Sequence, residues 1–491
     1  MKQTKASLLV LVVILTILYM GLSRGDFSPF LFDLGMGTVL LALAVFFVHS
    51  QRSSLRGVWL KPSNFFVLAF LAVNFQYMAD VRLGLKSMEY RWILYPDLLN
   101  HCLALGVIGF LAFVAGYIWK PIPDLVANRV EGQQSEAPVS PATFRLVTIL
   151  QVLLFFVFIL TIDVGSFLSG AVFSSEEGAS FLAANSESLL YVTNALVIMF
   201  VAMSSAKDGS FKAFFSNFPK VSLAIIGLYM VLRLFSGDRG PVIYTAFLLL
   251  YGFLFSTRKK IRLWVVLVLM LAAMLLMSLV GMVRNMDISQ SFGQRMSSAF
   301  STFSEGGRFD NDEDERTVFR FTEELGFSCV VNQIDVEAIK SETAKLDHGK
   351  HLFYEVLNGI PFLPGIIQNS FHVRPEQFSS SGFANYHFFS GYERTWGIGT
   401  TIIGDFYISF GALGVLLGLF LAGLLFRYLD VSLFVSNRSM IKPFPLLFVL
   451  LFASKAVYMP RSIILCEWPR FIWGVILLLI IRAITGDRRI V

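Results

Sequence analysis

Apolar stretches alternate with short polar segments along this chain of 491 residues. Many of these stretches reach about 18 to 20 residues, the length that a helix needs to cross a hydrocarbon core of about 30 Å. Backbone groups in lipid must be hydrogen-bonded within their own segment, so we expect helices rather than strands. The predicted spans lie near residues 6–23, 30–49, 64–81, 102–119, 145–163, 188–205, 219–236, 241–257, 263–283, 400–426, 443–459 and 470–484. This pattern predicts an all-α, polytopic membrane protein with about 12 transmembrane helices.

The first apolar stretch has the basic start and apolar core that are typical of a signal peptide. No small-x-small cleavage pattern follows it, because residues 21–24 read Gly-Leu-Ser-Arg and lead directly into the next span. We therefore expect this stretch to be kept as the first transmembrane helix.

The orientation of the spans follows from Lys and Arg, which are enriched in cytoplasmic connections. With the N-terminus placed inside, every connection on that side is basic, and the segment 258–262 with its four basic residues is the strongest anchor. The outer connections carry fewer basic residues, with the exception of 82–100. We therefore expect both termini in the cytoplasm.

This topology divides the chain into three parts. Residues 1–283 would form spans one to nine, residues 284–399 a large outer loop, and residues 400–491 the last three spans. A loop of that length is improbable unless it is functional. Within it, residues 350–368 read as a short amphipathic or re-entrant element that Pro361 and Pro364 break. No internal repeat is visible, so the usual pointer to a secondary transporter is absent.

Composition adds to the membrane interpretation, because 55% of the residues are hydrophobic and only 15% are charged, against about a quarter charged in soluble domains. The formal net charge of +6 does not indicate nucleic-acid binding, since the basic residues are dispersed at helix ends. No metal-ligand spacing occurs among Cys and His, so neither a metal nor a cofactor is expected. Cys102, Cys329 and Cys466 would all lie on the outer side, where one disulfide could form, but unpaired thiols are the favoured interpretation.

Ionisable residues inside spans are costly and often mark function. Arg233, Asp405, Lys455 and Arg470 all fall near the outer ends of predicted spans. An enzyme that works on one face needs such a one-sided layout, whereas a transporter of charged cargo needs groups near the midplane. For any single residue, snorkelling to the interface is the simpler interpretation.

The sharpest local motif is Ser-Gly-Asp-Arg-Gly-Pro at 236–241, between the seventh and eighth spans. Its two glycines permit a tight turn, and Pro241 suits the first position of a helix. The N–H groups and dipole at that helix N-terminus, beside Arg239, would form an anion site suited to phosphate. The alternative is a plain helical hairpin in which Asp238 is the cap and Arg239 snorkels.

Further charged residues fall on the predicted outer side of the membrane. The basic residues among them could help to hold a phosphate or diphosphate headgroup. The acidic run 310–315 could hold a divalent cation, although a solvated loop is favoured because no glycine shapes it as a calcium loop. The basic residues are Arg284, Arg295, Arg308, Arg316, Arg320 and Arg461.

The candidates for proton transfer are His372, His387, Glu393 and Asp405. A partly desolvated carboxylate or histidine could deprotonate a sugar hydroxyl. Asp405 also shares a helical face with Thr401 and Ser409. Each residue taken alone also fits a structural role.

Two motifs, Gly237-Asp238-Arg239-Gly240 and the glycine-rich segment 397–414, resemble the O-antigen polysaccharide polymerase (Wzy) family. The layout is similar too, with about a dozen Phe-rich spans and a large outer loop before the last three. The resemblance implies a periplasmic glycosyltransferase of the bacterial inner membrane. It would transfer the growing glycan from one undecaprenyl diphosphate carrier to the non-reducing end of the next repeat unit, and undecaprenyl diphosphate would leave.

The resemblance also implies that Arg239 and Arg284 contact the diphosphate, and we add Gly240 and Arg461 to this predicted site. Arginines would stabilise the charge of the departing diphosphate without a metal, so we expect a metal-independent enzyme. His387, Glu393 and Asp405 are the predicted catalytic residues. Asp405 stands where the family pattern leads us to expect Glu, one methylene longer, which weakens its assignment.

Two other functions stay open. An O-antigen ligase-type transferase would have a similar layout but would use lipid A-core as the acceptor. A lipid-linked oligosaccharide flippase would not be an enzyme, and it would place cationic residues along a central cavity. A dolichol-type transferase is disfavoured, because the first outer connection, 24–29, is too short to hold a site. The expected partners are undecaprenyl-diphosphate-linked glycans, the bilayer and a chain-length regulator protein.

Overall fold

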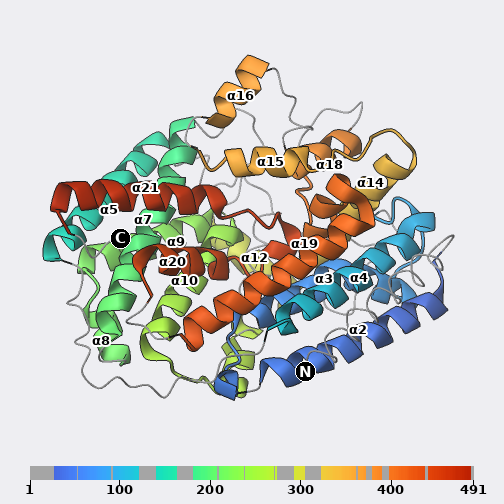
Figure 1. Ribbon diagram of the computed structural model, residues 1–491, viewed down its shortest axis with the longest axis horizontal. Coiled ribbons are helices and arrows are strands. Elements are labelled where there is room, and N and C mark those ends of the chain that lie inside the picture. The colour runs from blue at the N-terminus through green and yellow to red at the C-terminus, as the bar shows by residue number, and fades with distance from the viewer. Residues whose placement is uncertain are drawn as a thin grey trace. The chain divides into compact units, whose positions relative to one another are not determined.

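The computed structural model describes residues 27–51, 53–89, 92–120, 140–162, 181–206, 210–236, 238–269, 271–273, 292–304, 322–360, 363–371, 379–389, 397–436 and 441–487. Within these ranges all regular structure is helical and no strand occurs (Figure 1). The all-α prediction is therefore confirmed.

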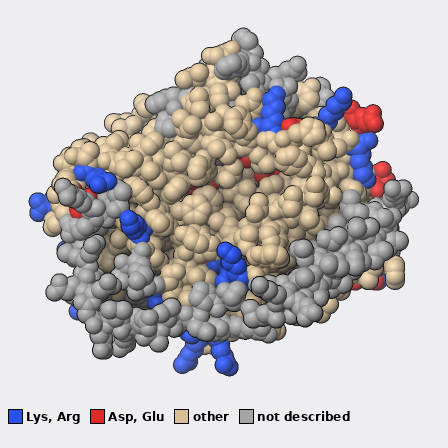
Figure 2. Space-filling view, viewed as in Figure 1, with Lys and Arg blue, Asp and Glu red and all other residues tan. Residues whose placement is uncertain are grey.

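Eight of the described helices are long and apolar enough to cross a membrane. Each overlaps one of the predicted spans, so the polytopic prediction is confirmed. Few charged side chains lie on the described part of the face in Figure 2, as expected for helices that contact lipid. The eight helices are α2 (Pro29–Ser50), α3 (Pro62–Arg82), α4 (Leu99–Ile118), α5 (Pro141–Thr161), α7 (Phe181–Ser205), α10 (Arg239–Thr257), α19 (Ile402–Phe434) and α21 (Trp468–Thr485).

The other four predicted spans are either shorter helices or are not fully described. Those near 219–236 and 443–459 are the shorter helices α9 (Lys220–Phe235) and α20 (Pro443–Ser454). The one near 263–283 is described only as far as residue 273, and the one at 6–23 lies outside the described residues. The total of twelve spans stays a prediction.

The chain divides into two compact units, and each combines segments that are distant in sequence. Unit 1 comprises Met1–Pro123, Asp310–Asp430 and Ala456–Cys466. Unit 2 comprises Asp124–Phe309, Val431–Lys455 and Glu467–Val491.

In unit 1, the almost fully buried helix α4 is the centre of the packing. Glycines allow α4 and α19 to approach closely, because a Cβ at Gly116 would meet the Phe420 carbonyl and a Cβ at Gly423 would meet the Phe113 carbonyl. α2 and α3 pack against other parts of α4. The part of α19 beyond its first turns is therefore held firmly against a buried helix.

Short helices from the predicted outer loop complete unit 1. The stretch 350–368 is divided as predicted, because α15 and α16 are separate helices, although Pro364 lies in the first turn of α16 rather than between them. α14 packs against α3, α4 and α18. These helices are α13 (Glu323–Gly326), α14 (Cys329–Lys340), α15 (Lys350–Leu357), α16 (Leu363–Phe371) and α18 (Ser380–Phe388).

Unit 2 is built around α7, which packs against α5, α10, α20 and α21. Buried polar pairs join these helices: Gln151 Nε2 donates to Asn194 Oδ1 at 2.7 Å, and the Tyr191 and Ser454 hydroxyls lie 2.9 Å apart. Each pair satisfies polar groups that have no water available in an apolar interior. Two further helices of this unit are α8 (Phe211–Ser216) and α12 (Phe292–Ser304).

Candidate functional site

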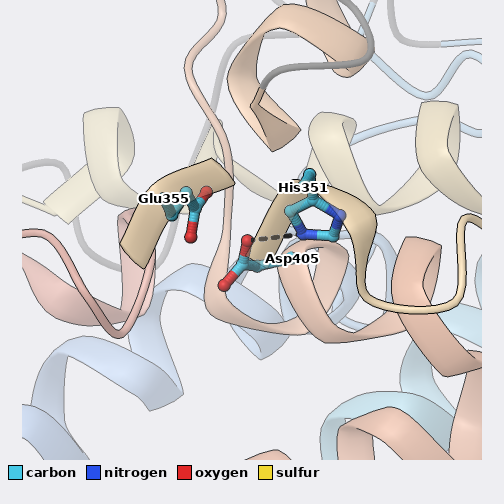
Figure 3. Close-up of side chains that lie close together, drawn as sticks. All are labelled: His351, Glu355 and Asp405. Atoms are coloured by element: carbon cyan, nitrogen blue, oxygen red, sulfur yellow. Dashed lines mark hydrogen bonds and ion pairs between the residues drawn. The ribbon is translucent and has the colours of Figure 1, made fainter. Parts of the chain in front are cut away.

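The first group of interest lies in unit 1, where α15 meets the first turns of α19. His351 and Glu355 lie one turn apart on α15, and both face Asp405 of α19 (Figure 3). We call these three residues the His351 cluster. One nitrogen or oxygen from each residue lies within 4.8 Å of those from the other two. His351 is 1% exposed, Glu355 2% and Asp405 0%, so the cluster is closed to bulk solvent.

A break in α19 explains how the segment before α15 reaches this position. Phe410 and Gly411 leave helical geometry, and Gly411 has φ of 63° and ψ of −149°, a conformation that suits glycine. The carbonyls of Ile408 and Ser409, at the break, accept hydrogen bonds from the N–H groups of residues 347 and 348, both at 3.0 Å. The break thus docks the start of α15 onto α19. The span predicted near 400–426 is present as α19, and the break at Phe410 and Gly411 is a feature that the apolar pattern does not predict.

Asp347 then orients the histidine. Its carboxylate accepts from the N–H groups of Gly349 at 2.8 Å and His351 at 3.0 Å, and it lies 2.5 Å from His351 Nδ1. The other ring nitrogen, Nε2, lies 3.1 Å from Asp405 Oδ1. Burial alone would lower the pKa of His351, but the contacts with Asp347 and Asp405 outweigh it and raise the pKa to about 10.

Carboxylate oxygens in this region outnumber the donors that the structure provides. Both oxygens of Glu355, both oxygens of Asp335 and Oδ2 of Asp405 are buried and accept no hydrogen bond from any described residue. Burial, together with the negative charge of Asp405, raises the pKa of Glu355 and of Asp335 well above the usual range. Asp335 belongs to α14 and lies directly against Gly404, where a Cβ would meet its Oδ2. This region therefore holds more buried carboxyl oxygens than the described residues supply with hydrogen-bond donors.

The second group lies in unit 2, around the start of α10. Asp238 is the N-cap of this helix and accepts from the Gly240 N–H at 3.3 Å. The Arg233 guanidinium is ion-paired with Glu187 on one side and with Asp238, at 3.3 Å, on the other. Arg239, the first residue of α10, is half-buried. The Asp238 cap, which the alternative interpretation of this motif expects, is therefore present, and α10 begins at Arg239 rather than at the predicted Pro241.

More charged residues of unit 2 reach the first turns of α10. Lys455 Nζ lies 3.1 Å from the centre of the Tyr244 ring and 3.3 Å from Glu467. Glu467 is fully buried and also pairs with Arg470 at 2.5 Å. We call Arg233, Arg239, Lys455 and Arg470 the α10 cationic group. The described contacts place three carboxylates against this group, those of Glu187, Asp238 and Glu467.

The predicted site residues are distributed over both units. Arg239 and Gly240 belong to unit 2, whereas Asp405, His387 and Arg461 belong to unit 1. His387 is half-buried in α18 with its ring centre 4.5 Å from that of Phe383, and Arg461 ends a short 3-10 turn, Met459–Arg461. Other predicted residues lie outside the described residues: Arg284, Glu393, His372, Gly237, Arg308, Arg316, Arg320 and the acidic run 310–315.

Sequence reasoning did not single out His351, Glu355, Asp335 or Asp347. The available signal was the i, i+4 spacing of His351 and Glu355 within the amphipathic stretch 350–368, because that spacing places both on one helix face. Their partner Asp405 is 54 residues from His351 along the chain.

Comparison with known proteins decides the family. Residues 4–487, nearly the whole chain, match the family model described as O-antigen polysaccharide polymerase Wzy. The chain belongs to this family. The resemblance seen at the two glycine motifs is thereby confirmed, and the family supports O-antigen polymerisation as the general activity of this multi-pass membrane enzyme. No curated protein and no solved structure gave a match.

Proposed function

We propose that this Wzy family member polymerises undecaprenyl-diphosphate-linked oligosaccharide repeat units on the periplasmic face of the bacterial inner membrane, with both termini in the cytoplasm. An acceptor hydroxyl at the non-reducing end of one unit attacks the anomeric carbon of the glycan on a second carrier. The new glycosidic C–O bond forms as the bond from that carbon to the diphosphate breaks. Undecaprenyl diphosphate leaves, and the hydroxyl loses its proton.

The observation that carries this proposal is the gathering of basic side chains, those of Arg233, Arg239 and Lys455, at the start of α10. A departing diphosphate gains negative charge as its bond to the sugar breaks, and fixed cations that face that charge lower the barrier. The helix dipole adds a partial positive charge at the same point. Asp238 already occupies the Gly240 N–H, so the proposed contact depends on Arg239 and the neighbouring cations more than on that N–H group. This half of the reaction needs no metal.

Arg284 and Arg461 stay proposed members of the diphosphate site. Arginine suits that role because its planar guanidinium can donate two parallel hydrogen bonds to one phosphate group.

We assign activation of the acceptor hydroxyl to the region of Asp405. Its Oδ2 accepts no hydrogen bond from the described residues, so we assign to this oxygen the role of proton acceptor. His387 and Glu393 are the alternative proton acceptors. A chain-length regulator protein is a proposed partner.

Two substitutions with opposite expected signs test the diphosphate site. Arg239→Ala removes a charge-assisted contact worth about 1.5–3 kcal/mol, so we expect kcat/KM for the undecaprenyl-linked unit to fall roughly 10- to 150-fold. Asp238→Asn keeps a good N-cap but removes one negative charge, so affinity for the carrier should hold or rise. Lys259→Ala, an exposed cation beyond the opposite end of α10, is the matched control. Normal chain length in a stably inserted Arg239→Ala protein would rule out the proposed site.

A deletion strain separates the three candidate functions. Loss of a polymerase leaves a single repeat unit on the lipid core, loss of a ligase leaves polymer on the undecaprenyl carrier, and loss of a flippase strands units on the cytoplasmic side. We expect the single-unit pattern, and either of the other two would reject the proposal.

A further inference from the structure

The His351 cluster has the composition of a metal site. It presents one imidazole nitrogen and two carboxylates from two helices, and their ligand atoms lie within 4.8 Å of one another. Ligands at about 2.0 to 2.2 Å from a common centre are separated by about 3 to 4.4 Å, so modest adjustment would bring all three to one ion. Figure 3 shows the Glu355 carboxylate aimed at Asp405 across this space.

Unpartnered oxygens are the independent sign that something binds here. Glu355 is 2% exposed, and both of its oxygens accept nothing from the described residues. Asp405 Oδ2 is also buried and accepts no hydrogen bond from the described residues. A buried carboxylate without a donor or cation loses its hydration and gains nothing in return. A divalent cation between the two would neutralise both carboxylates.

Asp347 supplies the outer support that metal-binding histidines normally have. A histidine ligand donates its second ring N–H to a carboxylate or carbonyl, which fixes the tautomer and the direction of the free lone pair. His351 Nδ1 lies 2.5 Å from Asp347 Oδ2, and Nε2 is turned toward Asp405. Ion binding would displace the Nε2 proton, and with Nδ1 as the remaining donor the Nε2 lone pair would be directed at the ion. Asp347 is held in turn by two backbone N–H groups.

We propose that His351 Nε2, Glu355 and Asp405 bind a single divalent cation. One nitrogen and two oxygen ligands suit Zn²⁺ or Mn²⁺, whereas Mg²⁺ and Ca²⁺ prefer oxygen ligands alone. The sequence shows no metal-ligand spacing among Cys and His, and a metal-independent enzyme is predicted because arginines could stabilise the departing diphosphate. The structure assembles this set from two helices instead.

Where the proposed function holds, the ion has a place in its acceptor half. An acceptor hydroxyl coordinated to the ion would have a lowered pKa. His351, Glu355 and Asp405 would hold the ion, which would make the acceptor oxygen a better nucleophile toward the anomeric carbon as the bond from that carbon to the diphosphate breaks.

The test measures ion binding on the full-length protein in detergent, without substrate. After chelation and removal of the chelator, Zn²⁺ and Mn²⁺ are titrated separately by calorimetry, and bound metal is counted by mass spectrometry. We expect one ion per chain and a higher Tm when it is bound. Glu355→Gln and Asp405→Asn should each weaken binding at least tenfold. Glu337→Gln, which removes a half-exposed carboxylate of α14, should leave it unchanged.

Folding of the variants is checked in the same samples. Glu355→Gln removes an unpartnered buried carboxylate, so its metal-free Tm should equal or exceed that of the metal-free wild type. A wild type that binds neither ion, or a folded Glu355→Gln that binds as tightly as the wild type, would overturn the proposal. Arg239→Ala should bind the ion normally, so a failure of the proposed diphosphate site would be distinguishable from a failure here.

Discussion

The contact between Gly404 and Asp335 positions α14 against the start of α19, and adding one methyl group tests it. A Cβ at Gly404 would meet Asp335 Oδ2, and it would lie 3.2 Å from Thr401 Oγ1. Asp335 is 0% exposed, so it has no open space to move into. Overpacking of this kind costs about 1–3 kcal/mol, and the gain in helix propensity from Gly to Ala returns up to about 1 kcal/mol. We expect Gly404→Ala to lower the free energy of unfolding by up to about 2 kcal/mol.

A double-mutant cycle isolates the contact. In an Asp335→Ala background the obstructing carboxylate is gone, so Gly404→Ala should be neutral or stabilising by up to about 1 kcal/mol. The coupling free energy between the two sites should therefore be about 1–3 kcal/mol. Thermal unfolding of the four proteins in detergent, followed by size-exclusion chromatography, measures it. Gly227→Ala is the control, because a Cβ on that α9 glycine meets nothing within 4 Å. Equal effects of Gly404→Ala in both backgrounds would refute the geometry from which the His351 cluster was built.

Two further predictions concern helix packing and the cationic group. Gly423→Ala should destabilise the protein by about 1–3 kcal/mol or more, because its Cβ would meet the α4 backbone rather than a flexible side chain. Gly37→Ala should leave the stability unchanged, because a Cβ there enters open space on α2. Equal Tm values for the two variants would contradict the close approach of α4 and α19. Glu467→Gln should lower the free energy of unfolding by on the order of 3 kcal/mol, because it removes the carboxylate that Lys455 and Arg470 share. An unchanged Tm would show that these ion pairs do not hold α20 to α21.

Helix type and the position of most spans could be predicted because they depend on local sequence. Runs of about 20 apolar residues leave little choice but a helix in lipid. Pro29 and Pro141 stand at the first positions of α2 and α5, where proline suits a helix start. The break at Phe410–Gly411 could not be predicted from the same pattern. It depends on the loop segment at 347–348, whose N–H groups satisfy the carbonyls that the break exposes.

The candidate sites show the same division between local and distant information. Arg239 and Asp405 could be singled out because each lies in a short glycine-rich motif near a span end. The partners of Asp405 could not, because His351 and Glu355 lie 54 and 50 residues before it and reach it only through the folding of the loop. The ion pair between Arg233 and Glu187 could not be predicted for the same reason, since the two residues are 46 positions apart.

The most direct test of the central claim is synthesis by the purified protein in liposomes that contain a single repeat unit on undecaprenyl diphosphate and no other acceptor. Glycan length on the carrier is followed by gel, together with the undecaprenyl diphosphate released. We predict a ladder of chains that are longer by whole repeat units, with one released carrier for each linkage, and its loss in the Arg239→Ala protein. Carrier-linked units that stay single in the presence of active protein, or that lengthen equally well with Arg239→Ala, would contradict the account.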